Sequence, residues 1–166
     1  MSYLGEDPRL RAIHETLKAA RAPRPRVAIC DPRAPRRPIG PWVTEVIRRA
    51  GGIDLLAVED DRTTDAGQVM PSGTGDALRL TDPELIVFVF AGVSLDEAVV
   101  LGQHHLADPA WDWARMGRSA VMESTLVQKP GPQLIDAVAC LAPFIAPALF
   151  APAPRHLARP ITHPSA

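Results

Sequence analysis

The chain has 166 residues, 46% of them hydrophobic and 22% charged, which suits a single domain with one hydrophobic core. Its formal net charge of −1 provides no overall positive field for a polyanionic backbone, so we expect no nucleic-acid partner. The amino terminus lacks the basic start and apolar run of an export signal, and no stretch approaches the roughly 20 apolar residues of a membrane span, so we expect a cytoplasmic protein, or a periplasmic one if a signal was removed.

A helix and a proline-rich linker are predicted at the start of the chain. Apolar residues recur at helical spacing in residues 8–20, between charged ones, which indicates an amphipathic helix. Prolines end this helix, so we assign residues 1–25 to a helix and linker. Residues 26–30 then form a brief apolar run of the strand type, which Asp31 and Pro32 interrupt.

Residues 31–41 are too rich in proline for a helix or strand, and we expect them to form a stiff loop. Its basic side chains are Arg33, Arg36 and Arg37. A guanidinium group matches a carboxylate or phosphate through two parallel hydrogen bonds, so these residues are candidates for ligand binding. The alternative is that they are solvated loop charges.

A second helix is predicted from Trp42, because apolar residues follow it with helical period and Gly51 stops it. Trp42 either stacks on a planar ligand or anchors this helix in the core. Beyond the helix, residues 59–76 are polar and contain glycine, which is typical of a surface loop.

A buried strand and the helix after it have the clearest local signals. Residues 85–90 are uninterruptedly apolar, as in a strand of a parallel sheet that is covered on both faces. Ser94 and Glu97 have the spacing of a capping box that opens the next helix. His104 and His105 near its end point about 100° apart and cannot easily chelate one metal, so we expect a surface or capping role for them.

The last predicted elements are a short strand at residues 119–122 and, after a Pro-Gly-Pro turn, a helix over residues 134–145. The tail, residues 151–166, is rich in proline, and we expect an extended or disordered end that adds nothing to the core. Cys30 and Cys140 fall on a strand and a helix, where we expect buried free thiols.

Strands alternating with helices predict an α/β fold for residues 26–150, with a single Rossmann-like parallel sheet of about four strands and helices on both faces. In such a sheet the carboxyl ends of the strands lie at one edge, where ligands bind. We call this edge the rim. Its predicted loops are residues 31–42, 91–95 and 123–132.

The sequence lacks the parts of a catalytic site. It has no dinucleotide-binding Gly-x-Gly-x-x-Gly motif, no phosphate-binding loop with its lysine and no Gly-x-Ser-x-Gly turn of hydrolases. Glu123, Ser124 and Thr125 follow the strand at 119–122, yet no base is placed to activate a nucleophile there. We therefore expect no enzyme and no catalytic cofactor, and no bound metal either.

Three segments, in order, resemble the carboxyl-terminal lobe of the ABC-transporter substrate-binding proteins that carry cobalamin, haem and ferric siderophores. They are residues 40–52 (GPWVTEVIRRAGG), 82–97 (DPELIVFVFAGVSLDE) and 129–135 (KPGPQLI). The likeness covers residues 26–150 and is nearest to the cobalamin-binding branch. The family fold implies two α/β lobes that hold the ligand between them, and here we expect the amino-terminal lobe to be missing.

The resemblance implies ligand contacts at the loop before Trp42, at Gly92 and Val93, and at Leu126 and Val127. Aromatic residues that often stack on a corrin or porphyrin in the family are replaced here by Val93, Leu126 and Val127. The resemblance therefore implies an apolar pocket without ring stacking at these positions.

From these features we expect a ligand-binding protein for a corrinoid, tetrapyrrole or other metal chelate, with cobalamin or haem as candidate ligands. One lobe buries less of a ligand than the roughly 70–90% that is typical, so we expect a homodimer or a partner that supplies a second lobe. The alternative is a protein-interaction or regulatory subunit that retains the fold without transport. A small-molecule enzyme is a third hypothesis, because the fold alone does not decide function.

Overall fold

A five-stranded sheet forms the centre of the molecule, with the strand order β2-β1-β3-β4-β5. This computed structural model describes residues 2–33, 39–55 and 82–162, so the predicted surface loop at residues 59–76 lies outside the described part. The strands are β1 (Arg26–Cys30), β2 (Ile53–Asp54), β3 (Leu85–Phe88), β4 (Arg118–Met122) and β5 (Ala158–Ile161). The helices are α1 (Pro8–Ala19), α2 (Trp42–Arg49), α4 (Leu95–Ala107) and α5 (Gln133–Ile145), with short 3₁₀ helices η1 (Pro109–Met116) and η2 (Ser124–Leu126). None of the described helices combines the length and apolar character needed to span a membrane.

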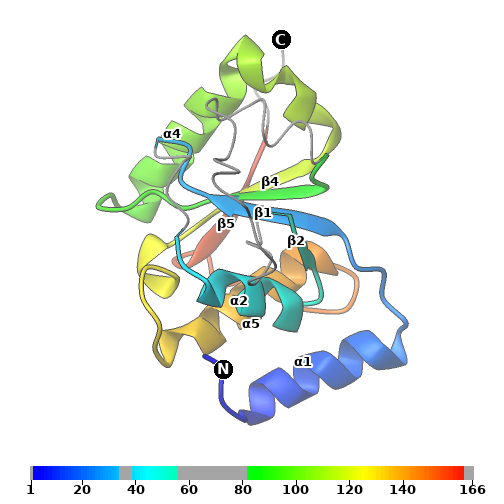
Figure 1. Cartoon of the computed structure of the whole chain (residues 1–166). Coiled ribbons are helices and arrows are strands. Elements are labelled where there is room, and N and C mark those ends of the chain that lie inside the picture. The colour runs from blue at the N-terminus through cyan, green and yellow to red at the C-terminus, as the bar shows by residue number, and fades with distance from the viewer. Residues whose placement is uncertain (1, 34–38, 56–81, 163–166) are drawn as a thin grey trace, which may run out of the picture.

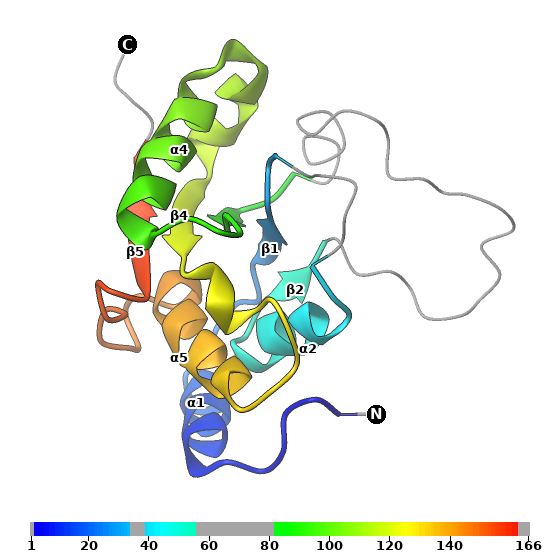
Figure 2. The same cartoon turned by 90° about the vertical axis from the view of Figure 1, so that its left-hand side faces the viewer.

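Helices cover both faces of the sheet (Figure 1, Figure 2). α2 and α5 lie against one face and α4 with η1 against the other, while α1 packs on the outer side of α2 and α5. Each face has its own hydrophobic core, because successive strand residues point to opposite sides. In β1, Val27 and Ile29 belong to the core beneath α2 and α5, whereas Ala28 and Cys30 belong to the core beneath α4.

The strands β1 to β4 run parallel, which the sequence predicts for β1, β3 and β4, whereas the two-residue strand β2 was not predicted. β1 lies between β2 and β3, with Cys30 opposite Phe88, and β3 also pairs with β4. β1 and β3 are almost wholly buried because both of their faces are covered, which explains their uninterrupted apolar sequences. The predicted α/β class, with helices on both faces of a mostly parallel sheet, is therefore confirmed.

Local signals in the sequence set the helix ends where they were predicted. At the start of α4 the Ser94 hydroxyl accepts a hydrogen bond from the Glu97 amide (3.2 Å). At the end of α2, Gly51 adopts a φ of 100°, a left-handed conformation that glycine enters without strain. Both ends therefore follow from residues within one turn of the helix.

Cys30 and Cys140 are buried free thiols, as the sequence predicts. Burial raises the pKa of Cys30 to about 12 and that of Cys140 to about 11. Both thiols are therefore protonated at neutral pH, and they serve as packing residues of the two cores.

The carboxyl-terminal tail takes part in the sheet, which the sequence does not predict. β5 pairs antiparallel with β4, and Ile161 is 5% exposed within the core beneath α4. We expected the tail to add nothing to the core, and this prediction is wrong for Ala158–Ile161. This strand has four residues and no hydrophobic periodicity of its own, and its partner lies far away in the sequence, so local analysis does not reveal it. Pro160 is tolerated because β5 is an edge strand.

Replacing Ile161 by alanine tests whether β5 completes the core beneath α4. We expect Ile161→Ala to lower the free energy of unfolding by about 2 kcal/mol or more, because it removes buried methyl groups and leaves a cavity. Thr162→Ala, at the neighbouring exposed position, is the control and should change this free energy by less than about 0.5 kcal/mol. Urea unfolding measures both variants, and equal stabilities would contradict a core role for β5.

Candidate functional site

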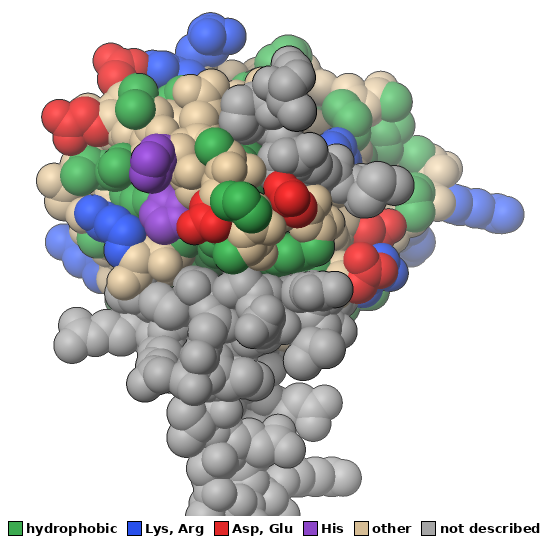
Figure 3. Space-filling model, turned by 90° about the horizontal axis from the view of Figure 1, so that it is seen from above, with side chains coloured by type: hydrophobic (Ala, Val, Ile, Leu, Met, Phe, Trp, Pro, Cys, Tyr) green, Lys and Arg blue, Asp and Glu red, His purple; other side chains and the backbone are tan. Residues whose placement is uncertain are grey.

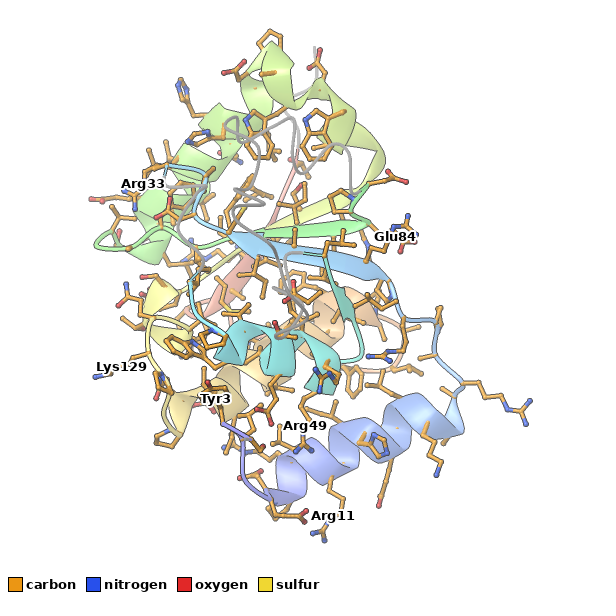
Figure 4. The ribbon with its side chains drawn as sticks, viewed as in Figure 1. Tyr3, Arg11, Arg33, Arg49, Glu84 and Lys129 are labelled. Atoms are coloured by element: carbon orange, nitrogen blue, oxygen red, sulfur yellow. The ribbon has the colours of Figure 1, made fainter. Side chains whose placement is uncertain are left out.

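The strand order changes direction between β1 and β3. The chain leaves β1 towards α2 on one face of the sheet, and it leaves β3 towards α4 on the other face. The loops after these neighbouring strands therefore diverge, and open parallel sheets bind ligands at such a point. Figure 4 shows Arg33 and Lys129 at this edge, which is the predicted rim, and Glu84 at the opposite edge.

An ion pair joins the two diverging loops. The Arg33 guanidinium donates to both carboxylate oxygens of Asp31, from Nε (3.1 Å) and from Nη2 (2.9 Å). Nη2 also donates to the Ala91 carbonyl (2.8 Å), and the Ala91 amide donates to Asp31 (3.3 Å). The Asp31–Arg33 pair thus connects the loop after β1 to the loop after β3.

The surroundings of this pair determine its charge. Burial raises the pKa of Asp31, but hydrogen bonds from Arg33 and from the Ala91 amide outweigh this effect, so the pKa lies below its ordinary value. Asp31 is therefore a carboxylate at neutral pH. Since the Arg33 guanidinium already binds Asp31 and Ala91, an anionic ligand would compete with Asp31 for it and would not meet a free cation.

Aromatic side chains lie next to Arg33 on the α4 side of the sheet. The Arg33 guanidinium carbon is 5.3 Å from the centre of the Phe90 ring, within the range of a cation–π contact. The His105 ring centre lies 6.0 Å from that of Phe90 and 6.3 Å from that of Trp111. Phe88 completes the cluster, 5.4 Å from Trp111. Seen from this side, histidines lie at the surface among hydrophobic, basic and acidic side chains (Figure 3).

The two neighbouring histidines differ in their surroundings. His104 is exposed, as expected, whereas His105 is half-buried among aromatic rings. Burial, followed by the charge of His104, lowers the pKa of His105, and the attraction of Asp108 and Asp31 offsets this only in part. Within the described part of the chain, no group of three histidine, cysteine, aspartate or glutamate side chains could hold a metal ion.

On the other face of the sheet, Trp42 joins the loops after β1 and β4. Its indole Nε1 donates to the Val127 carbonyl (2.7 Å). Gly40 lies against this indole, and a Cβ atom at residue 40 would overlap the ring, so the close approach requires glycine. The half-buried Trp42 side chain also packs on the core beneath α2 and α5. Trp42 therefore anchors its helix, and a ligand would contact only the exposed part of its ring.

The predicted ligand-binding residues form two groups along the rim, one on each face of the sheet. They are Arg33, Gly92 and Val93 on the α4 side, and Trp42, Leu126 and Val127 on the side of α2 and α5.

Their exposure differs between the groups. Gly92 is exposed with a φ of 81°, and Val93 is half-buried. Leu126 is 6% exposed and Val127 is fully buried, so their side chains belong to the core beneath α2 and α5. Arg36 and Arg37 lie outside the described residues. Ligand contact at all of these positions stays a prediction.

Sequence analysis did not find the partner of Arg33 or the position of His105, although signals for both are present. Asp31 and Arg33 have the spacing of an Asx turn, and the Arg33 amide does donate to Asp31 Oδ1 (3.0 Å). His105 follows the buried residues Ala98 and Gly102 by seven and three positions, a spacing that places them on one side of a helix.

Comparison with known proteins identifies a related fold. No protein-family model matches the sequence, and no curated protein matches it. Among solved structures, the ABC transporter substrate-binding protein from Listeria monocytogenes EGD-e is similar, with a TM-score of 0.58 and 11% sequence identity. The match covers 84% of this chain and 53% of that chain. This chain therefore shares the fold of about half of that protein. At this identity the likeness concerns the fold alone.

Replacing Asp31 by asparagine tests the ion pair that joins the loops. We expect Asp31→Asn to lower the free energy of unfolding by about 1 kcal/mol at neutral pH, because Arg33 and the Ala91 amide lose a charged acceptor. Since folding lowers the pKa of Asp31 from its ordinary value of 3.8, the native pair stabilises the fold above that pH. Its contribution is lost as pH falls through the lower, folded-state pKa.

Chemical unfolding at neutral and acidic pH measures this difference between the native chain and Asp31→Asn. Asp96→Asn is the control, because Asp96 pairs with Arg159 at 2.6 Å but is 83% exposed, and such pairs contribute little. A difference for Asp31→Asn that is the same at all pH values would contradict the pairing.

The stability of the native chain should also fall as pH drops below the ordinary histidine pKa of 6.5. Folding lowers the pKa of His105, so between the two values the unfolded chain binds a proton that the folded chain does not, and unfolding becomes easier. His105→Phe keeps an aromatic ring and should flatten this dependence. His14→Gln, on the exposed side of α1, is the control. If the pH dependence of stability is unchanged in His105→Phe, the loss of stability below pH 6.5 comes from another group.

Proposed function

We propose that this chain binds a large ligand at the rim, in the manner of one lobe of a cobalamin-type substrate-binding protein. The observation that carries this proposal is that two contacts join loops at the rim. The Asp31–Arg33 pair joins the loops after β1 and β3, where the strand order changes direction, and the Trp42–Val127 hydrogen bond joins the loops after β1 and β4. Loops already joined lose little freedom when a ligand arrives, which favours binding. The fold shared with the Listeria substrate-binding protein supports the same role.

The ligand that we propose is a corrinoid, a tetrapyrrole or another metal chelate. Such molecules combine wide apolar surfaces with polar or carboxylate groups at their periphery. The exposed part of the Trp42 ring and the half-buried Val93 suit the apolar surface. The loop that carries Arg33, Arg36 and Arg37 suits a peripheral carboxylate, which would exchange places with Asp31 at Arg33.

A second copy of the chain would supply the other wall of the site. Small-ligand sites usually bury about 70–90% of the ligand, and one edge of a single sheet buries less. We therefore propose a homodimer in which two rims face each other across a two-fold axis.

Visible-absorption titration with cyanocobalamin and haemin tests the ligand class. We expect one of the two compounds to give a saturable spectral change and to raise the melting temperature. Trp42→Ala removes the ring and should weaken binding by about fivefold to tenfold, since an aromatic contact contributes about 1 kcal/mol. Trp42→Phe keeps a ring at the rim but loses the hydrogen bond to Val127, so it should weaken binding less than Trp42→Ala.

Sedimentation of the same samples measures the mass of the complex, and we expect a dimer with bound ligand. Circular dichroism shows whether the Trp42 variants remain folded. Unchanged spectra together with unchanged melting temperatures for both compounds would reject this ligand class. If the chain sediments as a monomer even with bound ligand, the proposal that a second copy forms the other wall of the site is rejected.

A further inference from the structure

Residues 2–4 lie across α2, next to Trp42. Leu4 is 2% exposed and belongs to the core beneath α2 and α5. Ser2 and Tyr3 lie nearer the surface, where both bind the same side chain of α2, Glu45. This segment, which we call the strap, is therefore held by one buried apolar side chain and by one carboxylate.

Glu45 makes the polar contacts that hold the strap. Its carboxylate accepts hydrogen bonds from the Ser2 hydroxyl and from the Tyr3 amide (2.7 Å). Arg49, one turn further along α2, is the charged group that faces it, at 3.9 Å. Burial raises the pKa of Glu45, but the hydrogen bonds from the strap and the charge of Arg49 outweigh this, so the pKa lies below its ordinary value. Glu45 is therefore charged at neutral pH and binds the strap through charge-assisted hydrogen bonds.

An aromatic contact connects the strap to the rim. The ring centres of Tyr3 and Trp42 lie 6.0 Å apart at an interplanar angle of 71°, an edge-to-face arrangement. Trp42 in turn donates to the carbonyl of Val127, which follows η2. A continuous set of contacts thus runs from Glu45 through the strap and Trp42 to the loop after β4.

We propose that the strap positions Trp42 and, through it, the loop of residues 123–132 at the rim. Tyr3 and Glu45 are positioning residues, because they act through the indole and not on a ligand. When the edge contact of Tyr3 is removed, the indole is held less firmly and its hydrogen bond to Val127 opens more often. The effect on ligand affinity rests on the proposed function, whereas the coupling between the strap and this loop requires no ligand.

Hydrogen–deuterium exchange tests this coupling in the full chain without ligand. In Tyr3→Ala we expect amides in residues 39–45 and 124–131 to exchange about fivefold faster, which corresponds to the loss of one aromatic contact. The amides of β3 should change less, because this central, fully buried strand reports global unfolding and not local opening at the rim. Glu45→Gln keeps the size of the side chain but not its charge, and should show the same pattern. Tyr3→Phe keeps the ring and is the matched control, with native exchange expected.

Two results would overturn the proposal. One is faster exchange in the strap and the start of α1 alone, since the strap would then be attached without influencing the rim. The other is an equal rise throughout the chain, β3 included, since that indicates a general loss of stability.

Titration of the same variants with both cyanocobalamin and haemin tests the strap and the proposed function separately. If residues 124–131 exchange faster in Tyr3→Ala and the native chain binds neither compound, the role of the strap is supported and the proposed function is not. If exchange in Tyr3→Ala is native and the native chain binds one of the compounds, only the role of the strap is overturned.

Discussion

The pairing of β1 with β3 in the middle of the sheet is the constraint on which the site depends. Helices cover both faces of these two strands, and the apolar side chains of each strand belong alternately to the two cores. The register that places Cys30 opposite Phe88 also brings the next residues of the two chains together, so that Asp31 meets Ala91. A shift of one residue would turn every side chain of the strand to the wrong face, so burial holds this register firmly.

The sheet divides the rim into two parts with different chemistry. On the α4 side a guanidinium lies over an aromatic ring, and Asp31 neutralises its charge. On the side of α2 and α5 the contacts are an indole, a backbone carbonyl and the amino-terminal strap. Each part joins one pair of loops, so the rim is tied at two separate places. A ligand that spans the edge of the sheet would contact both parts.

Local signals were sufficient for most of the helices and strands and for the outline of the rim. The Ser94 and Glu97 pair and the apolar residues of β3 act within a few positions of one another, and both predictions are confirmed. The adjacency of the loops after β1 and β3 also follows from the α/β class. The hydrogen bond from Arg33 to the Ala91 carbonyl did not follow, because Ala91 is nearly sixty residues away, whereas the Asp31–Arg33 pair is local and its Asx-turn spacing was overlooked.

The sequence by itself determined the α/β class, the parallel direction of β1, β3 and β4 and the edge at which their loops gather, because hydrophobic patterns and helix caps depend on near neighbours. Only the tertiary structure decided that Ala158–Ile161 completes the sheet, that Leu126 and Val127 are buried, and that Tyr3 contacts Trp42. These features arise between segments far apart in the chain. Their energy comes from burial and from hydrogen bonds that exist only once the layers have packed.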